Sequence, residues 1–151
     1  MKSALAKPNI AVDPKKLIAQ ARACLDLAFA PYSQFSVAAA VVDDEGRVFT
    51  GVNVENASYG LTMCAERVAI FTAVAAGARR IIAVAVTAKN AASITPCGAC
   101  RQVMAEFCDA KVPVYRDNGS SKPSHSTVSS LLPDAFGAPQ LNLGDKLPSE
   151  R

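Results

Sequence analysis

The chain has 151 residues, which fits one domain able to bury a hydrophobic core without disulfide bonds. Hydrophobic residues make up 50% and charged residues only 19%, below the roughly 25% usual for soluble domains, so we expect part of the surface to be buried in a homo-oligomer. A net charge of +3 and the absence of Trp argue against a basic, aromatic groove for nucleic acid, and we therefore expect a small-molecule substrate.

The first twelve residues carry lysines and scattered apolar residues but no continuous apolar stretch. This pattern matches neither a secretory signal peptide nor a membrane span. We expect a flexible N-terminal extension over 1–12, one domain over 13–137 and an irregular tail over 138–151. The five cysteines are an odd number, which favours reduced thiols over a set of disulfides. We therefore expect a cytoplasmic protein with no membrane partner.

The first predicted helix begins at Asp13, a capping residue that is followed by proline at the first helical position. Apolar residues then recur at helical spacing as far as Pro31, which we expect to end the helix. These apolar residues are Leu17, Ile18, Ala21, Leu25, Ala28 and Phe29.

Two β-branched or apolar runs follow, at 36–42 and 47–54, and the Asp-Asp-Glu-Gly sequence between them predicts a hairpin. A second helix is expected from Cys64 to Ala76, where Gly77 would close it. Its apolar face would carry Ile70, Phe71 and Val74.

The run at 81–86 is short and almost continuously apolar, which is typical of a central strand covered on both faces. A third helix is expected from Pro96, and it would bury Val103, Met104 and Phe107. The run at 112–115 predicts a strand at or near a sheet edge because it contains a proline. Residues 118–126 predict a polar loop or short hairpin, and 127–132 a short helix capped by its threonine. The alternation predicts an α/β fold with one mixed sheet between helices.

Two cysteine motifs lie at predicted helix starts and carry the chemistry of the chain. Cys64 and Glu66 belong to a Cys-Ala-Glu sequence, and Cys97 and Cys100 to a Pro-Cys-Gly-Ala-Cys sequence. Cysteines three apart share a helical face, and a third thiolate leaves a tetrahedral zinc ion one open position for water. Glu66 would carry the proton that such a water releases near neutral pH. The motifs therefore predict metal-assisted hydrolysis.

Helix starts also suit these motifs electrostatically. Thr62 and Thr95 are expected N-caps, which would put Cys64 and Cys97 in the first turns, where free N–H groups and the helix dipole stabilise thiolates. Three thiolates around one dication leave a net negative charge. We expect Arg67 to donate a hydrogen bond to a thiolate and to withdraw electron density from it.

The residues alone leave other interpretations open. A C-x-x-C pair also occurs in redox proteins and in structural zinc sites. Cys24 or Cys108 could supply a fourth ligand, although both lie at apolar helical positions that favour packing. Phe35 and Phe136 would more often be core or interface side chains than ligand contacts. The single histidine, His125, lies in a polar stretch and is expected to be solvated.

The sequences PYSQFSVAA at 31–39, GVNVENASYGLTMCAER at 51–67, PCGACRQ at 96–102 and LLPDAFG at 131–137 resemble those of the short, homotetrameric cytidine deaminases. The resemblance covers nearly all of the chain between the first helix and Gly137. It implies a three-layer α/β/α cytidine-deaminase-like fold with about five strands in one mixed sheet. It also implies hydrolysis of free cytidine and deoxycytidine to uridine and deoxyuridine plus ammonia, as in pyrimidine salvage. In that reaction zinc-bound hydroxide attacks C4 while Glu66 shuttles protons.

The resemblance assigns roles to single residues. It makes Glu66 the catalytic residue and gives three zinc ligands, Cys64, Cys97 and Cys100. Asn53 and Glu55 match the pair that grips the ribose. These two residues are two apart at a predicted strand end, so their side chains would face the same way, although without the comparison they could also be a turn-forming pair.

Further substrate contacts follow from the same resemblance. Phe35 would flank the pyrimidine, and Phe136 would reach the site of a neighbouring subunit. The backbone of Ala65 and the carbonyl of Thr95 would contact the base. Tyr59 of an adjacent chain would lie near the sugar. The implied assembly is a homotetramer whose sites are shared between subunits.

Two alternatives to nucleoside deamination remain at this stage. The same zinc core could deaminate another amino-heterocycle, such as a nucleoside antibiotic or a base held in nucleic acid, although the chain lacks the basic aromatic channel expected for the latter. The chain could also be a non-enzymatic, zinc-stabilised domain. Four protein ligands and no open position would favour that second alternative.

Overall fold

Five strands form one sheet in the order β2-β1-β3-β4-β5, with residue bounds β1 (Val37–Asp43), β2 (Val48–Val52), β3 (Ile81–Ala88), β4 (Pro113–Arg116) and β5 (Ser124–Thr127). The pair β3 and β4 is parallel and the other neighbours are antiparallel, so the sheet is mixed, as predicted. The computed structural model describes residues 10–90 and 93–141. Within the expected tail, 138–141 form a short 3₁₀ helix, η3 (Ala138–Leu141), while the rest of the tail and residues 1–9 lie outside the described residues.

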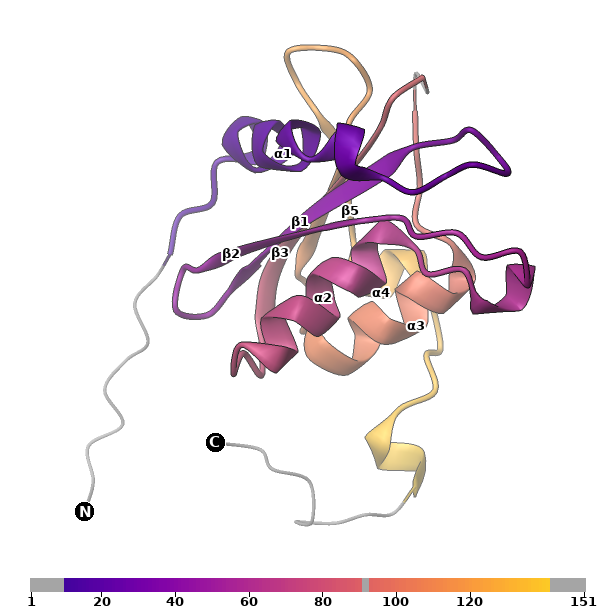
Figure 1. Ribbon diagram of the computed structural model, residues 1–151. Helices are drawn as coiled ribbons and strands as arrows, with labels where there is room; N and C mark the ends of the chain where they lie inside the picture. The colour runs from indigo at the N-terminus through magenta and orange to yellow at the C-terminus, as the bar shows by residue number, and fades with distance from the viewer. Residues whose placement is uncertain (1–9, 91–92, 142–151) are drawn as a thin grey trace, which may run out of the picture.

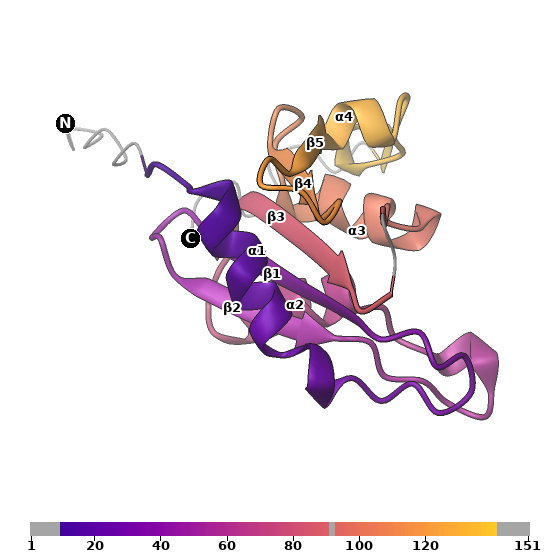
Figure 2. The same ribbon diagram turned by 90° about the horizontal axis from the view of Figure 1, so that it is seen from above.

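Helices cover both faces of the sheet, which confirms the three-layer expectation (Figures 1 and 2). Helix α1 (Pro14–Ala23) packs on one face against alternate strand residues such as Ala38 and Ala85. The opposite face is covered by three helices, α2 (Ala65–Ala75), α3 (Gly98–Phe107) and α4 (Val128–Leu131). Their apolar residues meet the other set of alternate strand residues, for example Val84 and Val114. No helix of the described residues has the length and apolar character needed to cross a bilayer.

The hairpin of β1 and β2 has the predicted turn, and its second strand, β2, packs against α2. The Asp43 carboxylate accepts the N–H groups of Glu45 and Arg47, and Gly46 takes a left-handed φ of 82°. Gly51 in β2 lies against the helix backbone: a Cβ placed on it would lie 2.4 Å from the nitrogen of Ala69. Only glycine therefore allows this close approach of strand and helix.

The first helix ends earlier than its apolar pattern predicts. α1 stops at Ala23 and a 3₁₀ turn, η1 (Leu25–Leu27), follows. Phe29, which the helical pattern would bury, is 55% exposed. Its N–H donates to the carbonyl of Asn53 at 3.0 Å, and it forms a parallel bridge with Val54. Pairing with a distant segment therefore overrides the local helical preference.

The remaining elements are found as predicted, but the apolar faces of two helices differ in part. In α3, Met104 is buried as expected, whereas Val103 and Phe107 are partly buried. In α2, Ile70 is buried but Phe71 is 43% exposed, so the expected apolar face is wrong at Phe71. The alternative of a short hairpin at 118–126 is correct, because β5 pairs with β4. Thr127 caps α4 in a capping box. His125 is exposed on β5, with its ring 6.1 Å from that of Tyr115.

Candidate metal centre and active site

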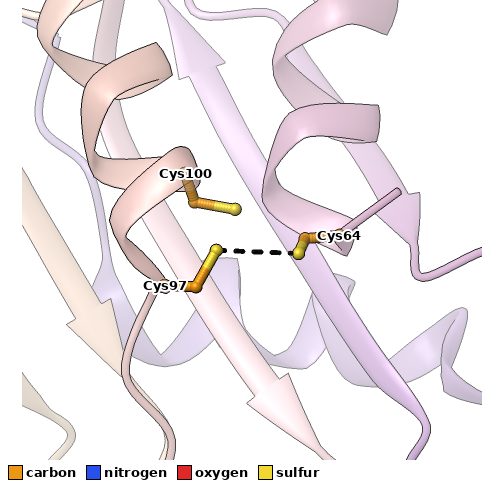
Figure 3. Close-up of side chains that lie close together, drawn as sticks. All are labelled: Cys64, Cys97 and Cys100. Carbon is orange, nitrogen blue, oxygen red and sulfur yellow. Dashed lines mark hydrogen bonds between the residues drawn. The ribbon is translucent and has the colours of Figure 1, made fainter. Parts of the chain in front are cut away.

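Three sulfur atoms meet where α2 and α3 begin side by side (Figure 3). The Sγ atoms of Cys64, Cys97 and Cys100 all lie within 4.8 Å of one another, and those of Cys64 and Cys97 are 3.8 Å apart. Two sulfurs that bind one tetrahedral zinc ion at about 2.3 Å are about 3.8 Å apart. The three side chains are therefore spaced to hold zinc.

The cysteines sit closer to the helix ends than predicted. Cys64 and Cys97 are themselves the N-cap residues, with extended backbones, whereas Thr62 and Thr95 were expected to be the caps. Neither cysteine makes a side-chain capping hydrogen bond. The Thr62 hydroxyl instead accepts the N–H of Asn56. The sulfurs thus lie at the positive ends of two helix dipoles, which favours the thiolate form.

The pKa values of the neighbouring thiols show that a cation is needed for them to ionise together. A hydrogen bond from the Cys100 thiol is the largest of the effects that lower the pKa of Cys64 to about 5, and Arg67 and Cys97 add to it against burial. The same hydrogen bond, burial and the nearby negative charges raise the pKa of Cys100 far above its usual range. Cys64 and Cys100 therefore ionise together only with a cation beside them.

Glu66 is a buried carboxyl in the first turn of α2, with 4% of its surface exposed. Burial raises its pKa, and the neighbouring Cys64 thiolate raises it further, while its own N–H, the Cys100 thiol and Arg67 act in the opposite direction. A carboxyl whose pKa is raised by burial holds a proton more readily than an exposed carboxyl, which suits a group that accepts and returns a proton.

Arg67 makes the predicted contact with the thiolates. Its Nη2 lies 3.4 Å from the Sγ of Cys64 and 3.5 Å from the carbonyl of Thr62. Its Nε is buried and has no hydrogen-bond partner among the described residues. The arginine is thus held beside the sulfur by one edge of its guanidinium group.

A short pair of backbone hydrogen bonds joins the sulfur site to the segment with Asn53 and Glu55. Val54 donates to the carbonyl of Met63 at 3.0 Å, and Met63 donates back at 2.9 Å. Met63 directly precedes Cys64. The expected sugar-contacting residues are therefore fixed next to the start of α2.

Asn53 and Glu55 both contact the segment 32–37, as expected for residues two apart. The Asn53 amide accepts the N–H of Val37 and donates to the carbonyl of Phe35, both at 2.8 Å. One oxygen of Glu55 accepts the N–H groups of Tyr32 and Ser33, and the other accepts the Ser33 hydroxyl. The Ser33 hydroxyl is the largest cause that lowers the pKa of Glu55.

The three predicted aromatic contacts are all exposed in the single chain: Phe35 is 42%, Phe136 is 58% and Tyr59 is 74% exposed. Tyr59, in the 3₁₀ helix η2 (Tyr59–Leu61), lies 5.9 Å from the ring of Tyr32. The carbonyl of Phe136 accepts from the amide of Gln102 in α3 at 2.8 Å. The C-terminal aromatic is therefore tied to the helix that carries two of the cysteines.

Two residues that follow the second cysteine motif were missed by the sequence interpretation. Arg101 donates to the carbonyls of Pro96 and Leu131, at 2.8 and 2.9 Å, and to the hydroxyl of Thr95 at 3.3 Å. Together with Gln102 it joins the loop before α3 to the segment after α4. The only sequence signal for this role is their place directly after Cys100.

The other two cysteines do not extend the metal site. Cys24 ends α1 on the opposite face of the sheet, and its thiol donates to the carbonyl of Ala21 at 3.1 Å. Cys108 lies in the core at the far end of α3, where burial raises its pKa to about 12. Across the described ranges 10–90 and 93–141, the group able to hold a metal consists of three cysteines, which leaves a fourth position open.

Comparisons with known proteins agree with this geometry. Residues 12–116 match the family model described as the cytidine and deoxycytidylate deaminase zinc-binding region. The cytidine deaminase of Halalkalibacterium halodurans is 48% identical over 131 residues, which are 87% of this chain and 99% of that protein. That of Sporosarcina psychrophila is 44% identical over 131 residues, 87% of this chain and 96% of the relative. The crystal structure of cytidine deaminase from Burkholderia pseudomallei superposes with a TM-score of 0.78 at 47% identity. The match covers 83% of this chain and 100% of that chain.

Proposed function

The chain belongs to the zinc-binding cytidine and deoxycytidylate deaminase family, and from this membership we propose that it hydrolyses free cytidine and deoxycytidine to uridine and deoxyuridine plus ammonia. It is a zinc-dependent deaminase. The observation that carries the proposal is the triangle of sulfurs with a buried carboxyl on the same helix start. An open metal position supports hydrolysis over a purely structural role.

Zinc held by the three thiolates supplies a Lewis acid that makes a coordinated water acidic near neutral pH. We propose that Glu66 takes the proton of the attacking water and passes it to N3 of the cytosine ring. Glu66 then takes the remaining proton from the hydroxyl that the water has left on C4 and delivers it to the amino group, so that the C4–N bond breaks and ammonia leaves. Its raised pKa, set first by burial, supports this double role as base and then acid. Arg67 is proposed to stabilise the Cys64 thiolate through its 3.4 Å contact.

The substrate contacts are proposed from the same arrangement. Phe35 would flank the base, and Asn53 and Glu55 would hold the sugar. Their support is the shared contact with the segment 32–37, where the Asn53 amide binds the carbonyl of Phe35 and the Glu55 carboxylate binds the N–H groups of Tyr32 and Ser33. The proposed backbone contacts are supported by the position of Ala65 at the start of α2 and of Thr95 in the loop just before α3.

We further propose a cytoplasmic homotetramer that serves pyrimidine salvage and has sites shared between subunits. The exposure of Tyr59 and Phe136, at 74% and 58%, supports shared sites, because aromatic rings of this size are usually covered in the functional assembly. The cytoplasmic location is supported by the five free thiols, three of which must stay reduced to bind zinc.

The test is a Glu66→Gln variant measured with a substrate panel. We expect the variant to keep one zinc per chain and to lose at least about 100-fold in kcat on cytidine, because general acid–base catalysis contributes at least that factor. Zinc content and ultraviolet-monitored turnover of cytidine, deoxycytidine, cytosine and CMP are measured on the same samples. Substantial activity of Glu66→Gln would overturn the shuttle role, and a wild-type preference for cytosine or CMP would overturn the proposed substrate.

A further inference from the structure

The backbone of Phe35 is held by side chains on both sides. Its N–H donates to the hydroxyl of Ser33 at 3.0 Å, and its carbonyl accepts from the amide of Asn53 at 2.8 Å. Gln34, between Ser33 and Phe35, has a φ of 55°, a left-handed conformation that residues other than glycine rarely adopt. Such a conformation persists only where the surrounding contacts enforce it. The two side chains therefore fix the backbone from which the ring of Phe35 projects.

Ser33 is the point at which the aromatic and the carboxylate are connected. Its hydroxyl donates to one oxygen of Glu55 and accepts the N–H of Phe35. The other oxygen of Glu55 accepts the N–H groups of Tyr32 and Ser33, at 2.9 and 3.2 Å. A carboxylate has about four acceptor positions, so these bonds fix its orientation and leave room for about one more hydrogen bond.

We propose that Ser33 is a positioning residue for the nucleoside: its hydroxyl orients Glu55 toward a sugar hydroxyl and, through the N–H of Phe35, sets the ring against the base. The inference rests on the proposed function, because it takes Glu55 and Phe35 as substrate contacts. Ser33 acts on the bound substrate through these two residues and has no part in the proton transfers of Glu66. Its loss therefore weakens substrate binding more than the chemical step.

The test compares Ser33→Ala with Ser33→Thr and with the matched control Ser58→Ala. Ser58 is exposed in the neighbouring loop, and its hydroxyl makes no hydrogen bond to any of the described residues 10–90 and 93–141. We expect Ser33→Ala to raise KM for cytidine and deoxycytidine about 10-fold, the usual effect of losing a hydrogen bond to a charged group, with kcat changed less than about twofold. Ser33→Thr keeps the hydroxyl and is expected to restore most of the affinity, while Ser58→Ala matches the wild type.

A double-mutant cycle with Glu55→Gln tests the path of the effect. If Ser33 acts through Glu55, the fold-increase in KM of the double variant is well below the product of the two single fold-increases. Single increases that multiply in the double variant would overturn this path. Zinc content and circular dichroism confirm the fold, and Ser33→Cys serves as a second variant if Ser33→Ala is unstable. Wild-type protein inactive on cytidine refutes the proposed function. An active wild type with an unchanged KM in Ser33→Ala and Ser33→Cys, or a loss confined to kcat, refutes the inference alone.

Discussion

Replacing Gly51 by alanine is expected to push helix α2 away from the sheet. The added Cβ would lie 2.4 Å from the nitrogen of Ala69, 2.6 Å from the carbonyl oxygen of Ala65 and 2.9 Å from the carbonyl carbon of Val68. All three atoms belong to the helix backbone, which cannot rotate away as a side chain can. Reaching an ordinary contact of about 3.5 Å requires a displacement of about 1 Å.

This displacement has two measurable consequences. Overpacking of a core usually costs about 1–3 kcal/mol, and we expect the upper end of that range because no side chain can give way. For a chain of this size a loss of about 3 kcal/mol lowers the melting temperature by roughly 10 °C. Glu66 lies in the first turn of the displaced helix, and a misplacement of about 1 Å can reduce turnover about 100-fold.

The assay is thermal unfolding followed by circular dichroism, together with kcat/KM for cytidine. Gly60→Ala is the matched control, because a Cβ at Gly60 would meet no described atom within 4 Å other than those of its chain neighbours, and it is expected to behave as the wild type. The reasoning is refuted if Gly51→Ala melts within about 2 °C of the wild type and keeps its activity, since the strand and helix would then tolerate a side chain between them.

Two further predictions concern charges on the two sides of the sheet. Arg67→Ala is expected to keep zinc but to move the acid side of the pH–rate profile to higher pH. The reason is that Cys64 loses the cation that lies 3.4 Å from its sulfur and withdraws electron density from it. An unshifted pH–rate profile would rule out this role of Arg67. On the α1 face, burial tends to raise the pKa of Asp117, but hydrogen bonds from Arg22, Thr87 and the N–H of Gly119 lower it to about 2. Asp117 therefore stabilises the fold above its unfolded pKa near 4, and this contribution disappears as the pH falls from about 4 to about 2. Asp117→Asn is expected to lower the free energy of unfolding in urea by roughly 1–2 kcal/mol at pH 7, and this difference from the wild type should vanish near pH 2. A difference that does not depend on pH would contradict the assignment.

The sequence predicted the features that depend on local patterns. The continuous apolar run of β3 and the turn residues before β2 predict their elements, and the spacing of the cysteines predicts the metal centre. These features have a period or a motif that can be recognised within a few residues.

The features that sequence reasoning missed depend on distant contacts. The early end of α1 is imposed by Phe29, which pairs with Val54 twenty-five positions later in the chain. Likewise, Ser33 meets Glu55, and Arg101 meets Leu131, through hydrogen bonds between distant positions that have no periodic signal. The cysteines themselves act as N-caps in place of the threonines, which propensity would favour there.

The thiols of Cys64 and Cys97 belong to helices that are separated along the chain by the central strand β3. The pairing of β3 with β1 and the docking of both helices on the same face of the sheet bring these two ligands together. The ligand set is therefore assembled by the folded chain, and we expect bound zinc to stabilise that fold.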